Sequence, residues 1–102
     1  MEAQKVYAIL HNAYEFDDLN YGELTPIFMS LNKDNVIKEF NNIKEKEINW
    51  FNKIVKEKEQ WLNEHPEFKE DYQITINTND EFEIYLDNWC YKWALTEYEL
   101  DR

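Results

Sequence analysis

The sequence predicts an α+β protein, with a small antiparallel sheet of four to five strands packed on one long helix. Three observations lead to this prediction. The run from Asn32 to His65 has helical periodicity and contains no Gly or Pro. Two short apolar segments precede this run, and segments that alternate between apolar and polar residues follow it. We therefore expect the order ββα followed by βββ or ββα, in a single domain over residues 1–102.

The first two strands are expected over Lys5–Leu10 (KVYAIL) and Leu24–Met29 (LTPIFM). KVYAIL is apolar enough for a central strand. Pro26 has no backbone N–H to donate, which favours an edge or the start of a strand for the second segment. The connection over His11–Tyr21 is polar and turn-like, so the two strands should form an antiparallel hairpin with a long loop.

The helix is expected to bury two adjacent apolar rows, spaced by three, four or seven residues: Val36, Phe40, Ile43, Trp50, Ile54 and Trp61, and beside them Ile37, Ile48, Phe51, Val55 and Leu62. Ser30 or Asn32 can cap its start, and Pro66 ends it. Such a helix would be about 45 Å long, more than twice the length of a typical strand. Its second half should therefore fold over its own C-terminal segment, break near Asn49, or pack on a second protomer.

After Pro66 the sequence predicts a polar connector and then strands over Tyr72–Ile76 and Phe82–Leu86. A third strand is expected over Trp89–Leu95. A short helix there is the alternative, because nothing in WCYKWAL excludes one.

Charge narrows the choice of partners. The net charge is −11, and the residues after His65 carry ten acidic and three basic side chains, while the helical run is nearly neutral. Direct binding of nucleic acid or of an anionic membrane needs Lys and Arg, so both are disfavoured. An acidic surface suits a basic protein partner. The single cysteine, Cys90, and a start without an apolar signal core fit the cytosol of a bacterial host.

Catalytic and metal-binding motifs are not found. His11, His65 and Cys90 show no metal-ligand spacing, and the sole glycine, Gly22, cannot build a phosphate-binding loop. Cys90 lies between Trp89 and Tyr91, which predicts a buried and inert thiol. We therefore expect no enzyme, no cofactor and no metal.

Two features suggest binding. The first is a concentration of carboxylates that could imitate DNA phosphates on an outward face of the last strands: Glu67, Glu70, Asp71, Asp80, Glu81, Glu83 and Asp87. The second is an excess of aromatic residues, which act as hot spots when they lie at interfaces; the candidates are Trp50, Trp61, Trp89 and Trp93.

Three segments resemble a class of small acidic phage and mobile-element proteins from low-GC bacteria: the KVYAIL opening, PIFMS running into a capped helix, and the closing LTEYELD. Together they cover about a quarter of the chain. Some proteins of this class, including anti-CRISPR proteins, bind and block host effectors that handle nucleic acid. The resemblance implies an inhibitor of this kind, and it assigns no functional residues.

These observations lead to one hypothesis and one alternative. The hypothesis is a non-enzymatic inhibitor, a possible DNA mimic, that blocks a basic host defence protein such as a CRISPR effector. The alternative is a homodimeric assembly protein that pairs through Trp50, Ile54 and Trp61 of its helix.

Overall fold

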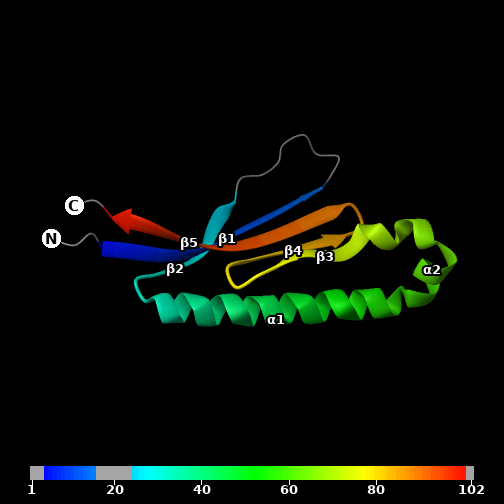
Figure 1. The fold of residues 1–102 in the computed structure, drawn as a ribbon, viewed down its shortest axis with the longest axis horizontal. Coiled ribbons are helices and arrows are strands. Elements are labelled where there is room, and N and C mark those ends of the chain that lie inside the picture. The colour runs from blue at the N-terminus through cyan, green and yellow to red at the C-terminus, as the bar shows by residue number, and fades with distance from the viewer. Residues whose placement is uncertain (1–3, 16–23, 101–102) are drawn as a thin grey trace.

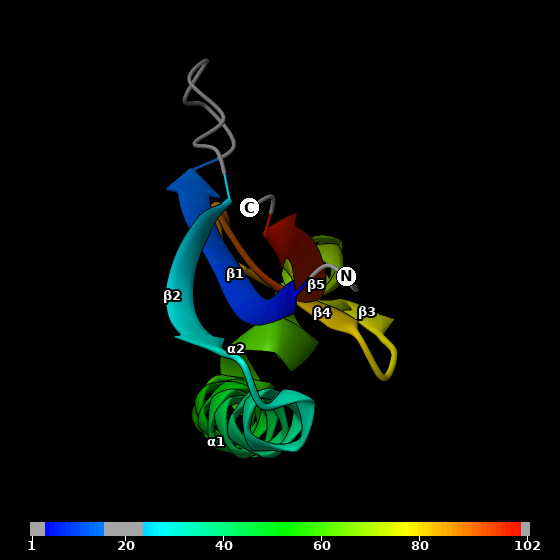
Figure 2. The ribbon, with the colours of Figure 1, turned by 90° about the vertical axis from the view of Figure 1, so that its left-hand side faces the viewer.

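The computed structural model describes residues 4–15 and 24–100, and it confirms the α+β class. All strand pairs are antiparallel, and the sheet order is β2-β1-β5-β4-β3. In chain order the elements are β1 (Gln4–Glu15), β2 (Thr25–Ser30), α1 (Lys33–Glu57), α2 (Glu59–Glu64), the 3-10 helix η1 (Pro66–Asp71), β3 (Tyr72–Asn77), β4 (Glu81–Leu86) and β5 (Trp89–Leu100). Helix α1 runs along one face of the sheet (Figure 1), and the end-on view shows these two layers (Figure 2).

Strands β1 and β5 are longer than the sequence predicts. They pair over twelve positions, from Gln4 opposite Leu100 to Glu15 opposite Trp89. The predicted turn from His11 onward is therefore wrong as far as Glu15, and residues 16–21 of that segment lie outside the described residues. At about 3.3 Å per residue such strands are about 40 Å long, which matches the 25-residue α1. The sheet therefore supports the whole of α1.

The shorter strands are staggered along this long pair. Strand β2 flanks β1 at Tyr7–His11, and β4 flanks β5 at Trp89–Ala94. Pro26 is the second residue of β2, an edge strand, and β1 is central, so both of these predictions are confirmed. The strand predicted over Trp89–Leu95 is also confirmed as the first part of β5, and the helical alternative is wrong.

Helix α1 begins where the sequence predicts and ends earlier. The Asn32 side-chain oxygen accepts the backbone N–H groups of Asp34 (3.0 Å) and Asn35 (3.3 Å), so Asn32 is the N-cap. Ser30 supports this turn by accepting the N–H of Asn32 at 3.0 Å.

No break occurs at Asn49. The break is at Lys58, after which α2 and η1 turn the chain back toward β3. This arrangement matches the first of the three predicted alternatives, because the end of the helical run folds over the C-terminal segment.

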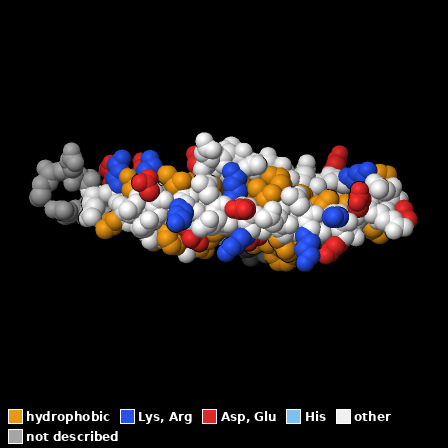
Figure 3. Space-filling model, turned by 90° about the horizontal axis from the view of Figure 1, so that it is seen from below, with side chains coloured by type: hydrophobic (Ala, Val, Ile, Leu, Met, Phe, Trp, Pro, Cys, Tyr) orange, Lys and Arg blue, Asp and Glu red, His pale blue; other side chains and the backbone are white. Residues whose placement is uncertain are grey.

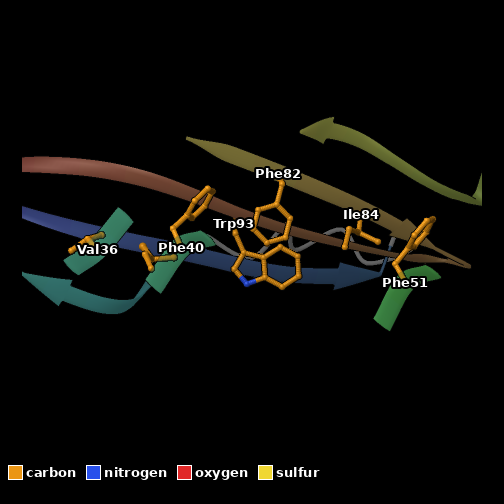
Figure 4. Packing of buried hydrophobic residues seen from close by; sticks show 7 residues of the cluster. Val36, Phe40, Phe51, Phe82, Ile84 and Trp93 are labelled. Atoms are coloured by element: carbon orange, nitrogen blue, oxygen red, sulfur yellow. The ribbon is translucent and has the colours of Figure 1, made fainter. Parts of the chain in front are cut away.

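The core lies between α1 and the middle of the sheet (Figure 4). The Trp93 ring stacks on Phe82 at 4.4 Å and on His11 at 4.5 Å, and Phe40 meets Phe82 edge-on at 5.5 Å. Phe51 is buried, whereas its predicted companion Trp50 is 41% exposed. The buried stripe of α1 therefore changes from the first predicted row to the second along the helix.

Candidate functional site

The seven predicted carboxylates fall into three groups rather than on one face. Four of them, Glu67, Glu70, Asp71 and Asp87, lie where η1 meets the β4–β5 turn. The contact between these segments is a backbone hydrogen bond of 2.9 Å, which the N–H of Asp87 donates to the carbonyl of Asp71. Asp87 has a φ of 60°, a conformation that Asp and Asn tolerate in tight hairpin turns.

The other three carboxylates already have partners within the protein. Glu81 and Glu83 alternate with the core residue Phe82, so they lie on the open face of the sheet, the face opposite α1. Glu81 pairs with Lys92 at 3.6 Å, and Glu83 accepts the Thr75 hydroxyl at 2.8 Å. Asp80 accepts the Thr78 hydroxyl at 2.9 Å in the β3–β4 turn, at the far end of β4.

We define the acidic end as α2, η1 and the β4–β5 turn. It carries Lys69, with Lys58 at its border as the N-cap of α2, and six carboxylates: Glu59, Glu64, Glu67, Glu70, Asp71 and Asp87. The two ion pairs found in the described residues, Lys5–Glu97 and Lys92–Glu81, lie elsewhere. The acidic end thus keeps a net negative charge at its surface. On the face that bears α1, by contrast, Lys and acidic side chains are interspersed (Figure 3).

Three stacked rings lie within the acidic end. Trp61 packs on His65 at 4.7 Å and on Phe68 at 5.2 Å, and the Nδ1 of His65 lies 3.0 Å from the Trp61 carbonyl, to which it donates. Trp61 and Phe68 are nonetheless 41% and 40% exposed. We call these three residues the aromatic trio. Of these three residues, the sequence pattern identified only Trp61 as a candidate for binding. His65 follows Trp61 by four residues and Phe68 follows His65 by three, and this helical spacing was the available signal for the other two.

One face of the trio already holds a cation. The Lys58 ammonium lies 5.7 Å from the Trp61 ring and 5.3 Å from the Tyr72 ring, and it donates a hydrogen bond of 3.1 Å to the Tyr72 hydroxyl. This hydrogen bond raises the pKa of Lys58, and burial opposes it. Ring faces and carboxylates both attract Lys and Arg side chains, and the acidic end presents the two together.

The remaining predicted aromatics are divided between surface and core. Trp50 and Trp89 are each 41% exposed, and both contact Tyr91, at 5.8 and 6.2 Å between ring centroids. Burial, with the nearby Glu47 carboxylate, raises the pKa of Tyr91. Trp93 is 4% exposed and belongs to the core. The predicted dimer row of Trp50, Ile54 and Trp61 is divided between α1 and α2, so it does not form the face of one helix.

The structure also places the residues considered for chemistry. Cys90 is fully buried on the open face of the sheet, and burial raises the pKa of its thiol, against a smaller opposing effect of its hydrogen bond with Tyr14. A thiol with a raised pKa is a poor nucleophile at neutral pH.

Among residues 4–15 and 24–100, no three His, Cys, Asp or Glu side chains gather as a metal site would require. No helix in the same ranges has the length and apolar character needed to span a membrane.

Comparison of the chain with protein-family models, with curated proteins and with solved structures gives no significant match.

Proposed function

We propose that this protein is a non-enzymatic inhibitor that acts in a bacterial cytosol and binds a basic, nucleic-acid-handling host defence protein through its acidic end. The observation that carries the proposal is the union of six carboxylates and two exposed, stacked rings on one short stretch of surface. The resemblance of the sequence to small phage proteins makes CRISPR effectors the first class of target to test.

Nucleic-acid-binding surfaces present Lys and Arg side chains to phosphates. Carboxylates at the acidic end can pair with the same side chains. The exposed ring of Phe68 offers a flat surface on which a guanidinium group stacks, whereas Lys58 already lies over the Trp61 ring. Binding of this kind excludes nucleic acid from the surface of the target. Attraction between net charges also makes association fast, and salt screens it over about 8–10 Å at physiological ionic strength.

The test is a competition assay. A defence protein captured from host lysate is loaded with labelled nucleic acid, and the inhibitor is titrated in at low and at high salt. We expect wild-type protein to displace the nucleic acid at low salt, and the double variant E67K/E70K to lose about tenfold or more in affinity.

The matched control is E39K/E45K, which changes net charge equally but lies on α1. We expect it to keep affinity within a few-fold, as does E81K/E83K on the open face. If E67K/E70K, E39K/E45K and E81K/E83K all lose the same amount of affinity, the effect is one of net charge alone, and a binding site at the acidic end is refuted. An unchanged affinity for W61A/F68A would remove the aromatic trio from the proposal.

A homodimer is the second candidate, and the exposure of Trp50 and Trp89 around Tyr91 favours it. Size-exclusion light scattering decides the point. A dimer that persists in high salt and is lost in W50A supports it, and a monomer at all concentrations tested excludes it.

A further inference from the structure

In the part of the chain that the structure describes, strand β5 has an unpaired edge at its end away from the acidic end. Strand β4 begins with Glu81 opposite Ala94, and Leu95 still hydrogen-bonds to Asp80 on that side, so from Thr96 onward the described residues pair with β5 on its β1 side alone. Figure 1 shows β5 continuing past the β3–β4 turn. We call residues Thr96–Glu99 the β5 edge.

The direction of the backbone groups follows from one hydrogen bond. The N–H of Leu95 donates to the carbonyl of Asp80 at 2.7 Å, so Leu95 points its backbone groups toward the β4 side. Alternate residues of an antiparallel strand point the same way. The N–H and carbonyl groups of Glu97 and Glu99 therefore face outward from the β5 edge, and within residues 4–15 and 24–100 no strand pairs with them there.

A pocket of about 530 Å³ lies directly beside this edge. It is bounded by β5, by the first turns of α1 and by the β3–β4 turn, whose residues immediately precede β4. Tyr7, Val36, Ile37 and Leu95 give it apolar walls. Its charged lining consists of two carboxylates, Asp80 and Glu97, and one ammonium group, Lys33. The volume is within the range of pockets that hold small ligands or side chains.

We propose that the β5 edge and this pocket form a docking site for an extended segment of a partner protein, which adds to the sheet in line with β4. Main-chain hydrogen bonds to Glu97 and Glu99 hold the segment, and a pocket beneath alternate residues selects its side chains. Because side chains alternate across a strand, one aliphatic residue enters the pocket while its two neighbours face the opposite side.

Charge identifies the occupant as a basic segment rather than a second copy of this chain. A two-fold pairing of two β5 edges centred on Tyr98 would set Glu97 of each copy opposite Glu99 of the other, and like charges directly opposite are destabilising. A segment with Lys or Arg two residues before and two residues after the aliphatic residue has these side chains on the pocket side, where they meet Asp80 and Glu97. Two lysines also lie in this region. The Lys5–Glu97 pair is 3.6 Å long and exposed, so it neutralises Glu97 weakly. The Lys33 ammonium lies over the Tyr7 ring, 5.9 Å from its centroid, and forms no ion pair with Asp80 or Glu97.

The site is separate from the acidic end and does not depend on the proposed function. We expect variants at one site to leave binding at the other unchanged.

The test uses three fluorescein-labelled heptapeptides in an anisotropy titration with the full chain. The first is Thr-Lys-Thr-Leu-Thr-Lys-Thr, the second has Asp in place of Leu, and the third has Glu in place of both Lys. We expect the first to bind, and each of the others to bind about tenfold more weakly or not at all, because one places a charge in an apolar pocket and the other repels Asp80 and Glu97. If the first peptide does not bind, or all three bind equally, the proposal is wrong.

Two variants test the mode of binding. Glu97→Pro removes the outward N–H at an edge position, where proline is tolerated in a sheet, and Glu97→Thr removes the carboxylate but keeps the N–H. We expect E97P to abolish binding and E97T to weaken it only a few-fold. A third variant, Ile37→Asp on the surface of α1, places a negative charge in the apolar part of the pocket and should also abolish binding. Circular dichroism then checks that each of the three variants is folded.

Hydrogen exchange gives an independent readout. Exchange of the Glu97 and Glu99 amides should slow when the first peptide binds, and unchanged exchange would show that no strand is added. A dimer in sedimentation equilibrium that E97P abolishes would assign the edge to a second copy and overturn the assignment to a basic peptide.

Discussion

The two halves of the long β1–β5 pair are completed in different ways. In one half β2 flanks β1, no strand of the described residues pairs with the β5 edge, and a pocket lies between that edge and the start of α1. In the other half β4 and β3 extend the sheet beside β5, and α2 with η1 packs at its end. The first half offers backbone groups and a pocket, while the second offers charged and aromatic side chains. One pair of long strands thus supports two surfaces of different chemistry, which can be tested independently.

The largest effect is expected at Trp93, which lies where the two halves overlap. Its ring stacks on His11 of β1 and on Phe82 of β4, and it is nearly fully buried. Trp93→Ala should lower the free energy of unfolding by about 3–5 kcal/mol, measured by urea denaturation. Trp89→Ala, at an exposed position of the same strand, is the matched control and should cost much less. Similar losses for both variants would mean that Trp93 does not join the halves as described.

A smaller and local effect is expected at Leu62, the buried residue of α2, which lies beside Val55 and Tyr72. Leu62→Ala should cost about 2–3 kcal/mol. Amide exchange should accelerate in α2 and η1 while β1 and β5 keep their protection. Gln60→Ala, on the exposed side of α2, serves as the control. Uniform acceleration across the sheet would show that the acidic end is not a separable unit.

The smallest effect is expected at the other end of the helical layer, at the N-cap Asn32. Asn32→Ala removes the acceptor for two backbone N–H groups and should cost about 1 kcal/mol. Asn42→Ala, an exposed interior position of α1, should leave stability unchanged or slightly higher, since Ala has the better helix propensity. If the two variants do not differ in thermal or urea unfolding, the cap contributes nothing to the start of α1.

Local signals in the sequence predict much of this fold. The two apolar rows predict α1, the short polar side chain of Asn32 predicts its start, and alternation predicts β3 and β4. The lengths of β1 and β5 were not predictable in this way. Their extensions carry polar residues such as His11, Asn12 and Thr96, and polar runs of this kind also occur in turns.

The break at Lys58 and the grouping of the carboxylates have no local signal. No Gly or Pro marks the break, and the contacts of Lys58 with Tyr72 join residues distant in sequence. Composition shows that the C-terminal third is acidic. Only the pairing of Asp87 with Asp71 shows that four of its carboxylates share one end of the molecule.

The pairing of Gln4 with Leu100 also has a consequence for the order of folding. Strands β3, β4 and β5 follow one another through short turns, so they can pair at little cost in loop entropy. Strand β1 must meet β5 across nearly the whole described chain, and such distant contacts slow folding. The strand that supports both halves of the sheet is therefore expected to join it late. Until it does, we expect the edge of β5 that later pairs with β1 to be exposed along its full length, where it can associate with other chains.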